Sequence, residues 1–307
     1  MNELLVICGP TATGKTSLGI ELARKFDGEI VSADSRQIYK KMDIGTGKEW
    51  GSGVKIWGYD LVSPKEEFSV SQYLKFADWT IADILRRGKL PILVGGTGLY
   101  IKGVVDGIPT ANIPQNKKLR ESLKNMSADQ LFEQLSQIDS LKAGSMNSSD
   151  KKNPRRLARA IEIATWSIDN SQKINVQKRK QYNALFLGLT APKKFLEDRI
   201  NRRVSARVKM GFENEIKKLL TLGVEWGDQS MLSLGYRQWR DYVEGAVDKE
   251  TALSEWKKEE RKYAKRQMVW WKNDRRINWF DISMGNYQKD VENLVKKWYT
   301  VNHAPKD

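Results

Sequence analysis

The sequence is poor in the side chains from which disulfides and many metal sites are built. Among its 307 residues it has one cysteine, Cys8, and one histidine, His303. A disulfide framework within one chain, a multi-cysteine zinc site and a histidine-based catalytic triad are therefore excluded. The chemistry has to come from carboxylates, hydroxyls, Lys, Arg and backbone amides. The scarcity of cysteine also suits a reducing compartment, so we expect a cytoplasmic protein.

Long apolar runs are missing as well. No segment approaches the roughly 20 apolar residues that span a bilayer, and the N-terminus has no signal pattern, so we expect no membrane partner. What the sequence does have is positive charge. Its 53 Lys and Arg against 38 Asp and Glu give a formal net charge of +15. This imbalance suits a polyanionic partner, and nucleic acid is the first candidate.

Short apolar runs alternate with helical patterns along the first part of the chain. The runs at 4–9, 28–34 and 90–96 are typical of strands buried in a sheet. Apolar residues at helical spacing between them predict helices over 17–26 and 71–87. This β-α-β alternation predicts an α/β fold in which helices cover both faces of a mostly parallel sheet.

The rest of the chain predicts one more strand and many helices. Residues 108–150 are polar, with leucines at helical spacing, and predict a small helical insertion. The run NALFLGLTAP at 183–192 predicts a core strand, after which we expect helices nearly to the end. The expected parts are a P-loop NTPase-like core with a helical C-terminal part (1–107 and 151–285), the insertion (108–150) and a C-terminal helix and tail (286–307).

The segment GPTATGKT at 9–16 matches the phosphate-loop pattern G-x-x-x-x-G-K-[ST] at every fixed position. Gly9 and Gly14 let the backbone turn inward, so that amides and a helix N-terminus point at phosphate oxygens. Lys15 adds a positive charge, and Thr16 offers a hydroxyl to Mg²⁺, the expected cofactor. The motif predicts a phosphate or pyrophosphate site but does not imply ATP hydrolysis. Its residues are Gly9, Pro10, Thr11, Ala12, Thr13, Gly14, Lys15 and Thr16.

Asp34 ends the second predicted strand. In open parallel sheets, ligands lie outside the carboxyl ends of the strands, so Asp34 is expected to face the phosphate loop. A carboxylate at this place can be a metal ligand, a general base or the N-cap of a following helix. Its position alone leaves these three roles open.

Three segments together resemble the tRNA dimethylallyltransferase family: 9–16, SADSRQIYKKMDIGTGK at 32–48 and VGGTGLYIKGV at 94–104. Later segments are similar to further blocks of that family, at 153–163, 199–216, 233–238 and 263–272. The resemblance implies an enzyme that moves a dimethylallyl group from dimethylallyl pyrophosphate to tRNA. The acceptor would be the exocyclic amine of the adenosine immediately 3′ of the anticodon. The implied partner is thus the anticodon stem-loop of tRNA, and we expect a monomer.

The resemblance also implies roles for single residues. Asp34 would be the general base, while Lys15 and Thr16 would hold the pyrophosphate and Mg²⁺. Arg203 would reach the pyrophosphate from the other side, and Thr97 would contact the substrate base. The positions that match tRNA-facing parts of the family are Asp34, Ser35, Arg36, Gln37, Thr97, Arg120, Arg155, Arg156, Gly235, Tyr236, Arg237, Gln238, Arg266 and Gln267.

Two segments depart from the family pattern. WGYDLV at 57–62 stands where a His-His-Leu-Ile-Asp stretch is usual, and Glu49 replaces a usual proline. No role of those histidines therefore carries over to this chain. The zinc-finger tail of some eukaryotic members is absent too, so the bacterial form of the family is the better match.

Two other protein classes share a phosphate loop. A small-molecule kinase would use Asp34 as base on a hydroxyl and Arg203 as a lid arginine, but it leaves the +15 charge unexplained. An ATP-dependent RNA-binding or motor protein needs a strand that ends in consecutive acids, whereas LPILVGG ends in glycines. Clusters of nine Lys and Arg each, at 151–180 and 257–276, suit a clamp around an RNA hairpin, for which a small-molecule kinase has no need.

Overall fold

The structure is a computed structural model that describes residues 2–170 and 182–303. It divides into two compact units: Met1–Asp106 with Lys180–Asp307, and Gly107–Arg179. The smaller unit thus includes residues 151–170, which the sequence analysis assigned to the core. No helix in the described part of the chain is both long and apolar enough to cross a membrane.

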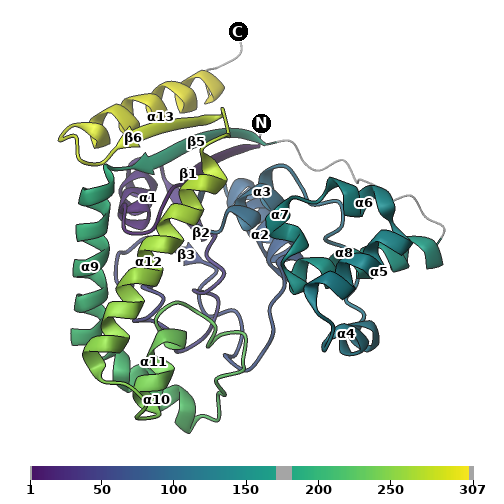
Figure 1. Cartoon of the computed structure of the whole chain (residues 1–307). Coiled ribbons are helices and arrows are strands. Elements are labelled where there is room, and N and C mark those ends of the chain that lie inside the picture. The colour runs from purple at the N-terminus through teal and green to yellow at the C-terminus, as the bar shows by residue number, and fades with distance from the viewer. Residues whose placement is uncertain (1, 171–181, 304–307) are drawn as a thin grey trace. The chain divides into compact units, whose positions relative to one another are not determined.

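The larger unit is built on a sheet whose neighbouring strands are all parallel. The strands within the described residues are β1 (Glu3–Cys8), β2 (Gly28–Ser32), β3 (Ile56–Trp57), β4 (Leu90–Val94), β5 (Asn183–Thr190) and β6 (Ile277–Asp281). Their order is β3-β2-β4-β1-β5-β6. Parallel neighbours require crossover connections, which contain helices here except between β2 and β3, where residues 33–55 form a loop (Figure 1). The predicted α/β fold with a P-loop NTPase-like sheet is confirmed.

Helices pack on both faces of this sheet. The helices of the larger unit within the described residues are α1 (Lys15–Lys25), α2 (Val70–Arg86), α3 (Gly98–Val105), α9 (Lys193–Lys209), α10 (Phe212–Thr221), α11 (Tyr236–Val243), α12 (Lys249–Trp271) and α13 (Tyr287–His303), of which α10 and α11 pack on α9 and α12. One face is closed by α1 and α13, whose Leu22 and Val295 are buried with Ile7 of β1. The opposite face of β1 is equally covered, since Val6 is fully buried, and α2 packs against β2 and β4.

The strand β6 corrects the expectation of helices nearly to the end of the chain. It pairs with β5 over Phe186–Thr190 and extends the sheet at its edge. Trp279 lies directly against Gly188, where a Cβ atom would stand 2.6 Å from the indole ring. The segment was missed because only its first residue, Ile277, is buried. It therefore lacks the continuous apolar run that marks a central strand.

The smaller unit is helical, as the leucine spacing predicted. Its helices are α4 (Lys117–Leu123), α5 (Ala128–Ile138), α6 (Ser140–Ser145), α7 (Ser148–Lys151) and α8 (Pro154–Asp169). Each begins after a polar residue whose side chain accepts a backbone N–H, namely Asn116, Ser127, Asp139, Asn147 and Asn153. The leucines of α4 and α5 pack on Leu157 and Ile161 of α8. The segment 107–150 thus has its hydrophobic core only together with α8.

A buried carboxylate ties α8 to α4. Glu162 is 2% exposed and accepts two hydrogen bonds from Arg120, both of 3.0 Å, and one of 2.6 Å from Asn116 N–H. Arg159 contributes a further ion pair at 2.5 Å. Burial acts to raise the pKa of Glu162, but the hydrogen bonds from Arg120 and Arg159 outweigh it and lower the pKa. The carboxylate is therefore charged in the folded unit.

We expect Glu162→Gln to destabilise the smaller unit by about 1–3 kcal/mol, because Arg120 and Arg159 lose their carboxylate and the buried amide cannot accept all of their hydrogen bonds. The stabilisation should be present above the unfolded pKa of about 4.3 and should be lost as pH falls through the lower folded value. Hydrogen exchange of peptides from 116–169 in the full chain measures both effects. Glu121→Gln, an exposed acid of α4, is the control. Equal protection in the two variants would contradict this account.

Candidate functional site

The phosphate loop of residues 9–16 connects β1 to α1, as predicted. It turns through left-handed backbone angles at Gly9 (φ 126°), Ala12 (φ 65°) and Gly14 (φ 87°). Glycine is required at position 9 for a second reason, because a Cβ atom there would lie 2.3 Å from the Leu189 carbonyl oxygen. The loop borders a cavity of about 830 Å³ whose lining comes entirely from the larger unit. Five of its residues line that cavity: Thr11, Ala12, Gly14, Lys15 and Thr16.

Three residues of the loop face elsewhere. Gly9, Pro10 and Thr13 do not line the cavity. Thr13 is 1% exposed and donates its hydroxyl to the Pro10 carbonyl at 2.9 Å. The same carbonyl accepts a hydrogen bond of 2.6 Å from Lys15 Nζ. The Pro10 carbonyl therefore holds the lysine side chain at the loop.

The helix α9 adds a row of arginines on the other side of the loop. Arg199 donates to the Ala12 carbonyl at 2.8 Å, and Arg203 donates to the Thr11 hydroxyl. Arg207 is buried and donates to the Gly45 carbonyl at 3.0 Å. Their spacing of four residues puts all three on one face of α9. Of these three arginines, only Arg203 was predicted as a site residue, although the four-residue spacing is visible in the sequence.

One buried acid of α12 stands among these cations. Glu260 is 4% exposed and lies 3.3 Å from Arg203 Nη2 and 3.5 Å from Arg207 Nη1. The excess positive charge affects its neighbours. Burial and the charge of Arg203 lower the pKa of Lys15 to about 8, and the same two causes lower the pKa of Arg207 to about 10. A polyanion in the cavity would relieve this repulsion.

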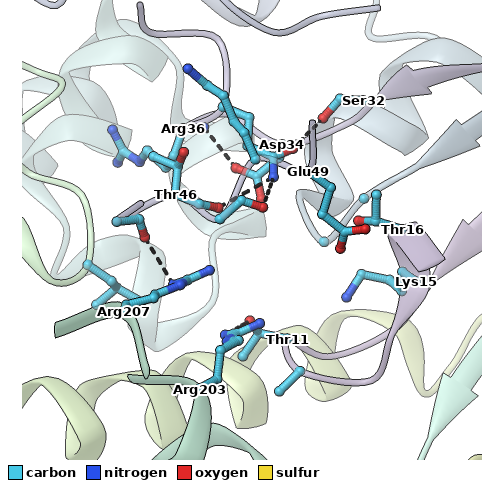
Figure 2. Close-up of a pocket in the computed structure, with 18 of the residues that line it drawn as sticks. Thr11, Lys15, Thr16, Ser32, Asp34, Arg36, Thr46, Glu49, Arg203 and Arg207 are labelled. Carbon is cyan, nitrogen blue, oxygen red and sulfur yellow. Dashed lines mark hydrogen bonds between the residues drawn. The ribbon is translucent and has the colours of Figure 1, made fainter. Parts of the chain in front are cut away.

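Asp34 follows β2 and lines the same cavity. Its Oδ1 accepts the Arg36 N–H at 2.8 Å, which closes a turn. Residues 33–69 are all described and contain no helix, so Asp34 is not the N-cap of one. Figure 2 shows Asp34 and Glu49 around the same space as Lys15, Thr16 and Arg203. The carboxylate is thus available as a base or as a metal ligand.

Hydrogen bonds to the two neighbours of Asp34 in the chain hold Thr97 close to it. Its hydroxyl accepts the Ser35 N–H at 3.1 Å, and its own N–H donates to the Ala33 carbonyl at 3.1 Å. The side chain of Tyr263 of α12 lies near the Thr97 side chain as well. The loop after β4 is therefore tied to the loop after β2, with Thr97 as the N-cap of α3.

The segment between Asp34 and Glu49 is held by two further buried groups, neither of which the sequence analysis identified. Glu215 accepts three backbone N–H groups, those of residues 43, 44 and 45, at 2.7–2.9 Å. Lys48 is buried and bonds Asp43 at 2.7 Å and Asp60 at 2.5 Å. Asp60 belongs to the segment 57–62, whose sequence differs from the family pattern. Through its ion pair with Lys48, this segment helps to hold the cavity wall in place.

Of the residues predicted to face tRNA, some line the cavity, some are buried, and others lie in the smaller unit. Ser35, Arg36, Arg237 and Arg266 line the cavity. Gln37 also borders it but is 8% exposed and bonds the Ser32 hydroxyl at 2.7 Å. Tyr236 is fully buried and donates to Glu215 at 2.6 Å, while Gly235 and Gln238 bond each other at the start of α11. In the smaller unit, Arg120 pairs with Glu162, Arg156 pairs with Asp150, and Arg155 is exposed.

Comparisons with known proteins agree with this geometry. The family model described as IPP transferase matches residues 37–274, and that described as isopentenyl transferase matches residues 2–56. The chain belongs to the IPP transferase family. It is therefore an enzyme, a transferase, and neither a small-molecule kinase nor a motor protein.

Individual relatives cover nearly all of the chain. A tRNA dimethylallyltransferase of Anoxybacillus flavithermus is 39% identical over 92% of this chain and 91% of its own length. A tRNA isopentenylpyrophosphate transferase structure from Bacillus halodurans is 34% identical, with a TM-score of 0.73, and covers 99% of this chain and 100% of its own. A eukaryotic dimethylallyltransferase acting on tRNA is 26% identical, with a TM-score of 0.81, and the match covers 99% of this chain and 81% of that one. The family resemblance predicted from the sequence is confirmed.

The lowered pKa of Lys15 leads to a prediction for pyrophosphate binding by the free protein. A bound polyanion favours the charged lysine, so binding is expected to take up a proton and to weaken as pH rises above about 8. Titration calorimetry with inorganic pyrophosphate from pH 7 to 9.5 measures this. Lys15→Met should weaken binding at pH 7 and lose most of the change with pH, whereas Lys25→Met should behave as wild type. Parallel pH curves for wild type and Lys15→Met would contradict the role given to this lysine.

Proposed function

We propose that the enzyme transfers a dimethylallyl group from dimethylallyl pyrophosphate to the exocyclic amine of the adenosine immediately 3′ of the anticodon in tRNA. The single observation that carries this proposal is the shared cavity of Asp34, the phosphate loop and Arg203. It offers cationic groups for a diphosphate and a carboxylate for an amine proton. The names of the relatives supply the substrate class.

The donor is expected to lie with its diphosphate between the phosphate loop and α9. Backbone amides of the loop, Lys15 and Arg203 would stabilise the negative charge that develops on the leaving group. The buried Nε of Arg203 has no hydrogen-bond acceptor among the described residues. A diphosphate oxygen could accept the hydrogen bond that this Nε–H group is able to donate.

The oxygen atoms around the cavity suit Mg²⁺, which prefers oxygen ligands and keeps several waters. Thr16 offers its hydroxyl, and the carboxylates of Asp34 and Glu49 border the same space (Figure 2). No cluster of three or more acidic, cysteine or histidine side chains occurs in the described part of the chain. This fits an ion held largely by the diphosphate itself. When bound, Mg²⁺ would neutralise part of the diphosphate charge.

The transfer replaces one bond by another. The C1–O bond between the prenyl group and the diphosphate breaks, a C1–N bond to the adenine amine forms, and the amine loses one proton. The diphosphate leaves with the electron pair of the C1–O bond. We propose that Asp34 accepts the amine proton, which typically contributes about 10²–10⁴-fold to a rate. Acceptance at Asp34 Oδ2 is compatible with the bond that Oδ1 receives from Arg36.

The acceptor base has to leave the stack of the anticodon loop before it can enter the cavity. That step costs a few kcal/mol and is easiest for a loop nucleotide. Ser35 and Thr97 hold polar groups beside Asp34 and are our candidates for the groups that contact the base. Exposed lysines such as Lys265 and Lys272 on α12 and at its end would attract the RNA phosphates. That the protein is cytoplasmic and that it is a monomer both stay predictions.

A single-turnover assay with tRNA, Mg²⁺ and labelled dimethylallyl pyrophosphate tests the reaction and the base together. Wild type should transfer the label to tRNA, and tRNA should not stimulate the release of ADP from ATP. Asp34→Asn should slow transfer at least about a hundredfold with little change in donor or tRNA affinity, because only the proton acceptor is removed. Asp78→Asn, on α2 outside the cavity lining, is the control. A mutant rate within a few-fold of wild type would exclude Asp34 as the base.

The binding of tRNA should weaken steeply with salt, because each neutralised phosphate releases counterions. Lys265→Glu with Lys272→Glu should weaken tRNA binding and reduce the slope of log Kd against log salt by about 2. Inorganic pyrophosphate binding should not change, since neither lysine lines the cavity. Lys75→Glu with Lys297→Glu alters the net charge equally and is the control. If both double variants give the same salt curves, this end of α12 is not part of the RNA interface.

A further inference from the structure

We propose that Gln267 of α12 is a positioning residue that couples the donor site to the acceptor site, by joining the phosphate loop to the loop that carries Thr97. The proposal deepens the proposed function, from which it takes the identity of the two ligands. Gln267 borders the cavity, so its predicted contact with tRNA stays a prediction, and the role proposed here is a further one.

The side chain of Gln267 bridges two loops that are far apart in sequence. Its Oε1 accepts the Thr11 N–H at 2.8 Å, and its Nε2 donates to the Gly96 carbonyl at 3.0 Å. Because one partner can only donate and the other can only accept, the orientation of the amide is unambiguous. Gln267 is 5% exposed, so water does not readily replace these bonds.

The contact with the second loop is tight. A Cβ atom on Gly96 would lie 2.0 Å from Gln267 Nε2, and one on Gly98 would lie 2.1 Å from the indole nitrogen of Trp270. Glycine at these positions leaves room for the Gln267 and Trp270 side chains where they now lie. Thr97, the residue between them, bonds Ser35 beside Asp34. A shift of Gln267 is therefore transmitted directly to the neighbourhood of the expected acceptor base.

The contact with the phosphate loop is equally specific. Thr11 is bound at two atoms, its N–H by Gln267 and its hydroxyl by Arg203. Arg203 in turn pairs with Glu260, which lies seven residues before Gln267 on α12. Residues 260, 263 and 267 are spaced by three and four residues and so share one face of the helix. That face contacts both the donor side and, through Tyr263, the Thr97 side.

A diphosphate that draws Arg203 or the phosphate loop toward itself would pull on both bonds of Thr11. Because a buried amide with two satisfied partners has few other positions, the loop of Gly96 and Thr97 has to follow. Coupling of this kind is reciprocal, so RNA bound beside Thr97 would alter diphosphate affinity by the same factor. Gln267 should matter more for this mutual effect than for either affinity alone.

The experiment measures the Kd of inorganic pyrophosphate with Mg²⁺, by calorimetry, for the full chain alone and saturated with an anticodon stem-loop RNA. The ratio of the two values is the coupling. For wild type we expect a ratio that differs from 1 by at least about fivefold. Gln267→Met keeps the length of the side chain but removes both bonds, and its ratio should fall within about twofold of 1. Glu255→Gln, on the same helix, should keep the wild-type ratio.

A second variant separates the two bonds and guards against misfolding of the first. Gln267→Glu keeps an acceptor for Thr11 N–H but loses the donor to Gly96, so its ratio should also approach 1. Its added charge weakens pyrophosphate binding in both states and cancels in the ratio. A wild-type ratio of 1, or variants that weaken both Kd values equally while keeping the ratio, would overturn the proposal. A wild-type protein that binds pyrophosphate but no RNA would instead overturn the proposed function on which the inference rests.

Discussion

The parallel pairing of β1, β2 and β4 is the constraint on which the whole site depends. Parallel strands end at the same edge of a sheet, so the loops that follow them meet there. Backbone bonds continue the pairing past the strand ends, from Gly95 N–H to the Ile7 carbonyl at 3.1 Å and from Ala33 N–H to the Val94 carbonyl at 2.7 Å. The phosphate loop, Asp34 and Thr97 are therefore held together by main-chain geometry before any side chain contributes.

On this frame, electrostatics divides the cavity into two functional sides. Lys15 and the arginines of α9 supply more positive charge than the buried Glu260 can balance, which leaves a site that favours a polyanion. Asp34 stands opposite, at the end of another strand. The arrangement separates the groups that suit a leaving diphosphate from the group that suits an incoming amine. The helix α12 contacts both sides and belongs to neither strand loop.

Much of the fold followed from the sequence, for identifiable reasons. The central strands β1, β4 and β5 are buried on both faces along most of their length, and their continuous apolar runs predicted them correctly. The edge strands β3 and β6 are short and only partly buried, so the same criterion could not find them. Within the site, Asp34 and Arg203 were located through motifs. Glu260 and Gln267 were not recognised as buried partners, because their roles arise from contacts between segments distant in sequence.

The bridge between Thr11 and Gln267 also has a consequence for the synthesis of the protein. The two residues are 256 positions apart in the sequence. In addition, β1 cannot pair with its neighbour β5 until residues from 183 onward have been synthesised. At about 5–20 residues per second, the ribosome needs roughly 13–50 s to reach Gln267 after making the phosphate loop. A nascent chain therefore carries the complete motif of 9–16 long before it has the assembled site.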